Sequence, residues 1–204
     1  MAVKVLAFAG SPRRHGNSET LLDWVLESMG GEDGVEIVKI ALTDVNVNPC
    51  RGCNACEIAG KCVQRDDMDR INDLLLEADC IVLSAPIFCM SINAQAKALI
   101  DRMQVHRSRK YVLHLPLVPP EKKGKRMGIF LSTAGQTWEY VFDGALPSVR
   151  CFFHLAAVRD QDVRFLMVNG VDEKGAILKH PTAEGDARQL GREAIQRVKE
   201  LKAA

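Results

Sequence analysis

The sequence predicts an α/β protein with a doubly wound, five-stranded parallel sheet in the strand order 2-1-3-4-5. Near-continuous apolar segments rich in β-branched residues recur along the chain, as in strands that are buried on both faces. Segments with apolar residues at helical spacing alternate with them. Three of the strand ends carry polar or glycine-containing loops, which is where open α/β sheets bind ligands. We expect residues 1–204 to form a single domain.

The predicted strands cover residues 3–9, 35–40, 79–84, 127–131 and 163–168. The predicted helices cover residues 19–29, a segment that begins at Asp66-Asp67, residues 94–103, residues 141–154 despite Pro147, and residues 182–201. Residues 107–125 are predicted to be an irregular, exposed connection. The basic run that ends at Arg126 is interpreted as a solvated surface, and Lys174-Gly175 as a surface turn.

The loop after the first strand reads GSPRRHGNS over residues 10–18 and leads directly into a helix. Such a junction directs free backbone N–H groups and the positive end of a helix dipole at an anion. Hydroxyl, amide and guanidinium donors accompany it, so a phosphate monoester would be held well: Ser11, Arg13, Arg14, Asn17, Ser18 and Thr20. The loop is neither a G-x-G-x-x-G nor a Walker A sequence. An ordinary turn with Ser18 as helix cap explains the spacing equally well.

Two further loops follow the third and fourth strands. Residues 85–91 contain Pro86, Ile87, Phe88 and Met90, which could line one edge of a flat ring or simply pack the loop against the next helix. Residues 132–136 read STAGQ and are small and polar. In the predicted strand order the ends of strands 1, 3 and 4 are neighbours, so the three loops should meet.

Four cysteines, Cys50, Cys53, Cys56 and Cys62, lie in a loop at about residues 49–63 with the spacing C-x2-C-x2-C-x5-C. This pattern favours a cubane iron–sulfur cluster, which takes four thiolates. A zinc site usually pairs two C-x2-C units across a longer spacer. Disulfides suit secreted chains. A set of free reduced thiols is the remaining alternative.

Composition excludes other classes of partner. The formal net charge of +1 argues against a nucleic-acid partner. The apolar runs are of strand length, so we expect no membrane span, and the N-terminus does not resemble a signal peptide. Seven mostly clustered cysteines favour a cytoplasmic location.

Three segments together resemble a known family. They are G-S-P-R-x-x-G-N-S at the first loop, A-P-I-F-x-x-S-x-x-A-Q-x-K-A-x-I-D-R at residues 85–102, and S-T-A-G-Q at residues 132–136. Together they resemble the NAD(P)H-dependent FMN reductase branch of the flavodoxin-like fold. The cysteine run resembles the cluster motif of the iron-sulfur flavoproteins in that branch. The resemblance covers roughly residues 1–168.

The resemblance implies a role for each matching position. The FMN phosphate would be held by Ser11, Arg13, Gly16, Asn17, Ser18 and Thr20. The flavin ring would lie between Pro86, Ile87, Phe88, Met90 and Ser91 on one side and Ser132, Thr133, Ala134, Gly135 and Gln136 on the other. Cys50, Cys53, Cys56 and Cys62 would ligate a [4Fe–4S] cluster. The family also implies a homodimer or homotetramer. Cys89 departs from the pattern. It could be a reactive thiol near the ring, but a small buried hydrophobe is the favoured interpretation, and Cys80 and Cys151 are interpreted as core residues.

These implications predict an FMN-dependent electron-transfer oxidoreductase. Electrons would come from a ferredoxin-like carrier or NAD(P)H and leave to a small-molecule acceptor. No catalytic acid or base is expected, and the histidines are interpreted as structural or exposed. The alternative is an NAD(P)H-dependent FMN or quinone reductase without a cluster. A third reading, a redox-sensing or metal-binding module, would bind no FMN.

Overall fold

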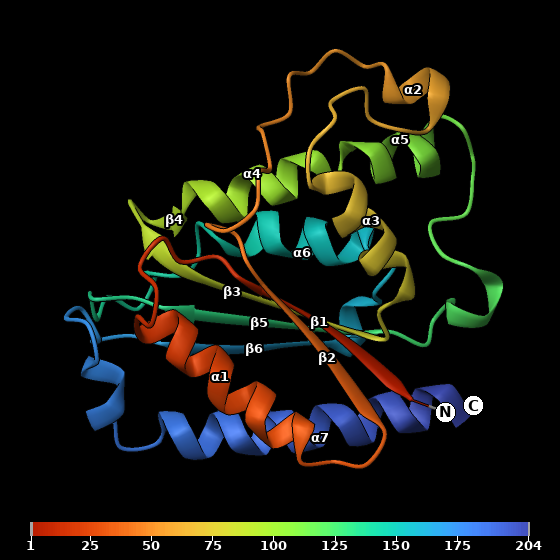
Figure 1. The fold of residues 1–204 in the computed structure, drawn as a ribbon. Helices are drawn as coiled ribbons and strands as arrows, with labels where there is room; N and C mark the ends of the chain where they lie inside the picture. Colours follow the sequence, from red (N-terminus) through yellow and green to blue (C-terminus); the bar gives the residue numbers. More distant parts are fainter. Residues whose placement is uncertain (1, 204) are drawn as a thin grey trace.

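A computed structural model describes residues 2–203, and its centre is one twisted parallel sheet (Figure 1). The sheet consists of β1 (Val3–Ala9), β2 (Val35–Ala41), β3 (Cys80–Phe88), β5 (Met127–Thr133) and β6 (Val163–Val168), in the order β2-β1-β3-β5-β6. A two-residue strand, β4 (Ser91–Ile92), pairs antiparallel with the end of β3. With β4 set apart, the five parallel strands have the predicted order.

Helices cover both faces of the sheet. On one face lie α1 (Asn17–Gly30) and α7 (Ala183–Ala203); on the other lie α3 (Met68–Glu77), α4 (Ala94–Arg102), α5 (Gln104–Tyr111) and α6 (Leu146–Leu155) (Figure 1). The short α2 (Cys56–Ala59) belongs to the cysteine loop and lies over α5. Short 3₁₀ turns complete the chain at η1 (Pro120–Lys122), η2 (Asp160–Asp162) and η3 (Ala176–Lys179). Within residues 2–203 no helix has the length and apolar character that crossing a bilayer requires.

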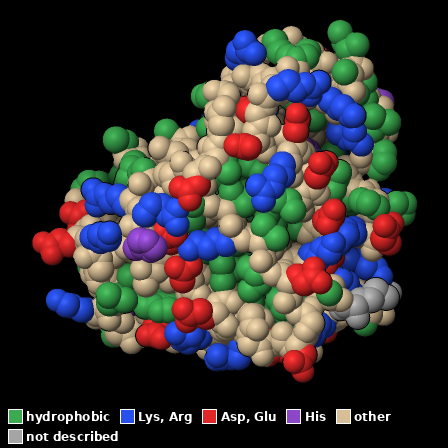
Figure 2. Space-filling view, viewed as in Figure 1, with side chains coloured by type: hydrophobic (Ala, Val, Ile, Leu, Met, Phe, Trp, Pro, Cys, Tyr) green, Lys and Arg blue, Asp and Glu red, His purple; other side chains and the backbone are tan. Residues whose placement is uncertain are grey.

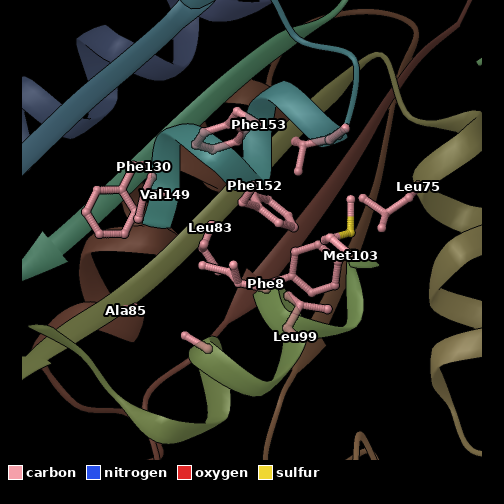
Figure 3. Close-up of a cluster of buried hydrophobic side chains, with 14 of the residues drawn as sticks. Phe8, Leu75, Leu83, Ala85, Leu99, Met103, Phe130, Val149, Phe152 and Phe153 are labelled. Atoms are coloured by element: carbon pink, nitrogen blue, oxygen red, sulfur yellow. The ribbon is translucent and has the colours of Figure 1, made fainter. Parts of the chain in front are cut away.

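Aromatic side chains fill the core between the sheet and α6 (Figure 3). Phe8 from β1 contacts Phe152 of α6 edge-to-face, with ring centroids 6.5 Å apart. The Phe152 and Phe153 rings also pack edge-to-face, with centroids 5.3 Å apart. Phe130 of β5 is also fully buried on this face. Alternate residues of the same strands point into a second core under α1 and α7. Burial on both faces explains why these strands read as continuous apolar runs.

The structure corrects several boundaries. Residues 139–145 form turns, and α6 begins only at Leu146, with Pro147 in its first turn, where the missing N–H has no helical partner to lose. Residues 107–111 belong to the helix α5 and not to the predicted irregular connection. Arg126 is not a solvated residue: it is 2% exposed and donates to the carbonyls of Leu75, Ala78 and Ala156.

Candidate functional site

A cavity of about 420 Å³ opens at the carboxyl ends of β1, β3 and β5. The three predicted loops converge on it. Ten of the predicted residues line this cavity: Ser11, Arg13, Gly16, Asn17, Ser18, Pro86, Ile87, Phe88, Thr133 and Gly135. Cys89, Val171, Asp172 and Lys174 complete the lining. The cavity lies where ligands bind in open α/β sheets.

The first loop is compact because its own polar groups brace it. The N–H of Arg13 donates to Ser11 Oγ at 3.1 Å, and the N–H of Gly16 donates to the Arg13 carbonyl at 3.2 Å. Gly10 lets the loop pass close to β3, since a Cβ there would lie 2.7 Å from the Ser84 carbonyl oxygen. Gly16 is the N-cap of α1, so the first N–H groups of that helix face the cavity end without an intrahelical partner.

Ser18 fixes the start of α1 against the sheet. Its Oγ lies 2.6 Å from Thr133 Oγ1 of β5, and its carbonyl accepts a 2.7 Å hydrogen bond from Ser84 Oγ of β3. Both Ser18 and Thr133 are buried. The helix terminus is therefore held rigidly above the ends of the two strands.

Glu19 was not singled out in the sequence, yet it organises the charges beside this terminus. Its carboxylate is 2% exposed and accepts from Lys39, Arg14 and the backbone N–H of His15. Burial alone would raise the pKa of Glu19, but these hydrogen bonds lower it to about 2. Arg14 is engaged by Glu19 and Asp44. Arg13 has no side-chain partner among residues 2–203 and is the arginine that lines the cavity.

The end of β3 folds back as a tight hairpin whose turn displays Cys89. Cys89 and Met90 have φ values of 48° and 67°, the left-handed conformation that both central residues of a type I′ turn require. Ser91 Oγ donates to the Gly144 carbonyl at 3.1 Å and anchors the hairpin. Phe88 is 42% exposed, and Cys89 is exposed at the cavity rim, so the expectation of a buried Cys89 was wrong.

The loop after β6 forms the wall that sequence reasoning missed. The side-chain amide of Asn17 donates to the carbonyls of Val171 and Glu173 and accepts from the N–H of Gly175. Lys174 was interpreted as part of a surface turn. Its position in the sequence could have indicated a place at the cavity. Lys174 follows the fifth parallel strand, which ends at the same edge of the sheet as the other loops.

Six predicted residues lie outside the cavity lining: Thr20, Met90, Ser91, Ser132, Ala134 and Gln136. Ser132 is fully buried and its Oγ donates to the Ala85 carbonyl at 2.8 Å, joining β5 to β3. The N–H of Ala134 donates to the Val168 carbonyl, and its carbonyl accepts from the N–H of Val171. Ser132 and Ala134 therefore hold the loops in place through hydrogen bonds, without lining the cavity.

The four loop cysteines line one smaller cavity, of about 90 Å³, next to α4 and α5. Cys50 and Cys53 are exposed, and Cys56 and Cys62 are partly buried. Gly52, Asn54 and Gly60 take positive φ values that let the loop coil. Four cysteine thiolates are the donor set that an iron–sulfur cluster takes. Within residues 2–203, however, no three Cys, His, Asp or Glu side chains converge as ligands of a single metal ion.

A buried ion pair holds the base of the cysteine loop. Arg102 of α4 binds Asp66 at 2.5 Å and donates to the Asn48 carbonyl at 2.9 Å; both charged side chains are at most 1% exposed. Burial alone would raise the pKa of Asp66, but hydrogen bonds from Arg102 and from the N–H groups of Asn48 and Met68 lower it to about 2. Arg102 also lines the cysteine cavity.

The remaining cysteines differ from one another. Cys80 is fully buried, and burial raises the pKa of its thiol to about 12, so it is a core residue as expected. Cys151 is exposed on α6, which corrects the expectation that it is buried. The cysteine cavity and the strand-end cavity share no lining residue.

The order of strands defines a flavodoxin-like protein, and the strand-end cavity lies at its switch point. A FMN-dependent NADH-azoreductase from Bacillus anthracis, solved in complex with FMN, has the same fold: the TM-score is 0.63 at 16% identity, and the match covers 97% of this chain and 99% of that one. The NADPH-dependent FMN reductase family matches residues 3–136, and the chain belongs to this family.

Two curated relatives are similar to part of the chain. The chain is 35% identical over 133 residues to an iron-sulfur flavoprotein of Archaeoglobus fulgidus, a match that covers 65% of this chain and 56% of the relative. It is 42% identical over 100 residues to an iron-sulfur flavoprotein of Methanocaldococcus jannaschii, covering 49% of this chain and 51% of the relative. The matches span about half the length of these relatives.

Proposed function

We propose that the protein is an FMN-dependent electron-transfer oxidoreductase that holds FMN in the strand-end cavity. The observation that carries this proposal is the convergence of three features on one cavity: the α1 N-terminus, Arg13, whose side chain has no partner within residues 2–203, and the apolar hairpin at Phe88. The first two suit a phosphate, and the third suits the edge of a flat ring. FMN would supply the redox chemistry; the chain would bind it, orient it and limit access of water.

The four loop cysteines are proposed to ligate a [4Fe–4S] cluster. The support is the shared cavity of Cys50, Cys53, Cys56 and Cys62 and the similarity to proteins named iron-sulfur flavoproteins. Such a cluster binds one thiolate at each iron. Seven free thiols agree with a reducing, cytoplasmic setting.

The charge around the cysteine loop suits an acidic electron carrier of the ferredoxin type. The loop contributes Arg51 and Lys61, and α5 contributes Arg107, Arg109 and Lys110, opposed in these two segments by Glu57, which pairs with Arg107. Figure 2 shows Lys and Arg side chains gathered at this end of the molecule. Complementary charge steers association of such partners. The small-molecule acceptor would enter at the strand-end cavity, and exposed Phe88, Trp138 and Tyr140 offer apolar surface for a homodimer or homotetramer.

The second candidate is an NAD(P)H-dependent FMN or quinone reductase without a cluster. Its support is the family itself and the absence, within residues 2–203, of a compact metal-ligand group. Nicotinamide would then serve as donor at the same cavity. Anaerobic purification followed by iron and sulfide analysis separates the two candidates.

The FMN site is tested by filling the phosphate end. We expect Ser18→Leu to weaken FMN binding at least tenfold, because the larger side chain displaces the α1 terminus from Thr133 and occupies the cavity. Thr43→Leu, at an exposed position outside the cavity, is the control and should bind FMN as the unmodified protein does. Both are measured by flavin fluorescence titration of protein whose fold has been checked by circular dichroism. Unchanged FMN affinity in Ser18→Leu would show that the FMN phosphate does not bind at this position.

A further inference from the structure

The loop of residues 171–175 is fixed to the start of α1 by one side chain. Asn17 is 8% exposed, and its amide nitrogen donates to the Val171 carbonyl at 2.9 Å and to the Glu173 carbonyl at 2.8 Å. Its amide oxygen accepts from the N–H groups of Gly175 at 2.9 Å and Ile177 at 3.4 Å. An asparagine amide offers two donor hydrogens and one acceptor oxygen, so these bonds occupy it fully. The side chain therefore holds the loop and has no donor left for an anion.

This attachment places Lys174 beside the helix terminus. Its neighbours Glu173 and Gly175 both bond to Asn17, the first residue of α1, and Lys174 lines the same cavity as Arg13. Neither Lys174 nor Arg13 has a side-chain hydrogen bond or ion pair with any residue in the range 2–203. Two cations that have no side-chain partner within residues 2–203 therefore line this cavity, beside the start of α1.

The same loop carries two carboxylates, Asp172 and Glu173, and Asp172 also lines the cavity. Asp172 packs against Gly135 at the end of β5, where a Cβ on Gly135 would lie 2.6 Å from the Asp172 carboxylate. Lys174 lies between Glu173 and Gly175, which bond to the start of α1, whereas the Asp172 carboxylate lies beside Gly135 at the end of β5. An anion beside the α1 terminus would have Lys174 and Arg13 available as cationic partners.

We propose that the 171–175 loop is part of the flavin site, that Lys174 and Arg13 together bind the flavin phosphate, and that Asn17 is a positioning residue that acts through this loop. The inference rests on the proposed function and adds a segment that lies beyond residues 3–136, the part of the chain that the family matches. A charged hydrogen bond to a phosphate oxygen is about twice as strong as a neutral one, so the effect should be measurable.

The test compares two flavins that differ only in the phosphate. We expect Lys174→Ala to weaken FMN binding about tenfold and to leave riboflavin binding unchanged. Lys174→Arg should retain most of the preference for FMN. Lys179→Ala, which removes an exposed lysine outside the cavity, is the matched control. Equal losses for both flavins, or no loss for either, would overturn the role of Lys174. An unmodified protein that binds neither flavin would instead refute the proposed function.

Asn17 is tested separately because its replacement also frees the loop. In Asn17→Ala we expect faster hydrogen exchange at the amides of residues 171–177 and the same loss of FMN preference over riboflavin as in Lys174→Ala. The double variant should lose little more of that preference than either single variant, because both changes act on one contact. Additive losses, or unaltered exchange in the loop, would show that Asn17 does not act through Lys174.

Discussion

At the scale of single residues, surroundings decide the role of each charge. Arg126 and Lys123 belong to the same basic run, yet Lys123 is exposed and Arg126 is enclosed. The Arg126 guanidinium binds carbonyls at the ends of α3 and α6, where a cation also complements the helix dipoles. Burial lowers its pKa to about 10. It caps two helices with one side chain.

Replacing Arg126 should therefore destabilise the fold. We expect Arg126→Met to lower the free energy of unfolding by about 2 to 4 kcal/mol, because it leaves three buried carbonyls without a donor. Lys123→Met, at the exposed position, should change it by less than about 0.5 kcal/mol. Urea denaturation of both variants provides the comparison. Equal stabilities would show that the buried guanidinium contributes nothing.

Asp66 predicts a pH dependence. Its folded-state pKa of about 2 lies below the ordinary value of 3.8, so its contribution is complete above pH 4 and disappears as the pH falls toward 2. Asp66→Asn removes that contribution and leaves Arg102 uncompensated, which should cost about 2 to 3 kcal/mol at neutral pH. Because Glu19 titrates in the same range, the informative quantity is the difference between the two proteins. That difference should shrink between pH 4 and pH 2; a constant difference would contradict the assigned pKa.

At the scale of elements, the packing of α1 against α7 depends on one glycine. A Cβ on Gly191 would lie 2.6 Å from the Val25 carbonyl oxygen and would collide with Ser28 Oγ. Gly185 lies in the same helix, and a Cβ there would meet nothing within 4 Å. The two positions thus separate close helix packing from helix propensity.

Alanine substitutions at these two glycines are expected to change the stability of the protein in opposite directions. Gly191→Ala should destabilise the protein by about 2 to 3 kcal/mol through overpacking. Gly185→Ala should stabilise it by up to about 1 kcal/mol, because alanine favours the helix. Thermal and urea unfolding of both variants measure the contrast. Stabilisation by both substitutions would mean that α1 and α7 are not in close contact.

Helices and strands could be predicted from the sequence where burial imposes a pattern of apolar residues. The three central strands β1, β3 and β5 are buried on both faces and therefore read as continuous apolar runs. The edge strands β2 and β6 are partly exposed but rich in β-branched or apolar residues, so all five parallel strands were placed. The helix α5 was missed because QVHRSRKY buries only Val105, His106 and Ser108 and shows no apolar stripe. The β3–β4 hairpin was missed because its turn residues are Cys89 and Met90, where the usual signal is Asn-Gly.

At the scale of the whole molecule, the sheet topology assembles one site and a long loop carries another. The convergence of the loop at residues 10–18 with the loops after β3 and β5 was predictable, since parallel strands end at one edge. The 171–175 wall depends on Asn17 bonding across 154 or more residues, and no local pattern shows such a contact. Likewise, spacing identified the cysteines, but only the fold shows that their cavity is separate from the strand-end cavity.

The separation of the two cavities predicts independent loading. Cys53→Ala should abolish cluster incorporation and leave FMN binding intact, because Cys53 is exposed in the loop and does not line the strand-end cavity. Iron, sulfide and flavin content of the anaerobically reconstituted variant would be compared with those of the unmodified protein. Loss of FMN together with iron would mean that the cysteine loop supports the flavin site.

The most direct measurement is the cofactor content of the unmodified protein, purified without oxygen and supplied with FMN, iron and sulfide. The account predicts about one FMN and about four iron atoms per chain. One FMN per chain without iron would favour the second candidate, an NAD(P)H-dependent FMN or quinone reductase without a cluster. A chain that retains no FMN, even at saturating concentration, would contradict the assignment of the strand-end cavity and the function built on it.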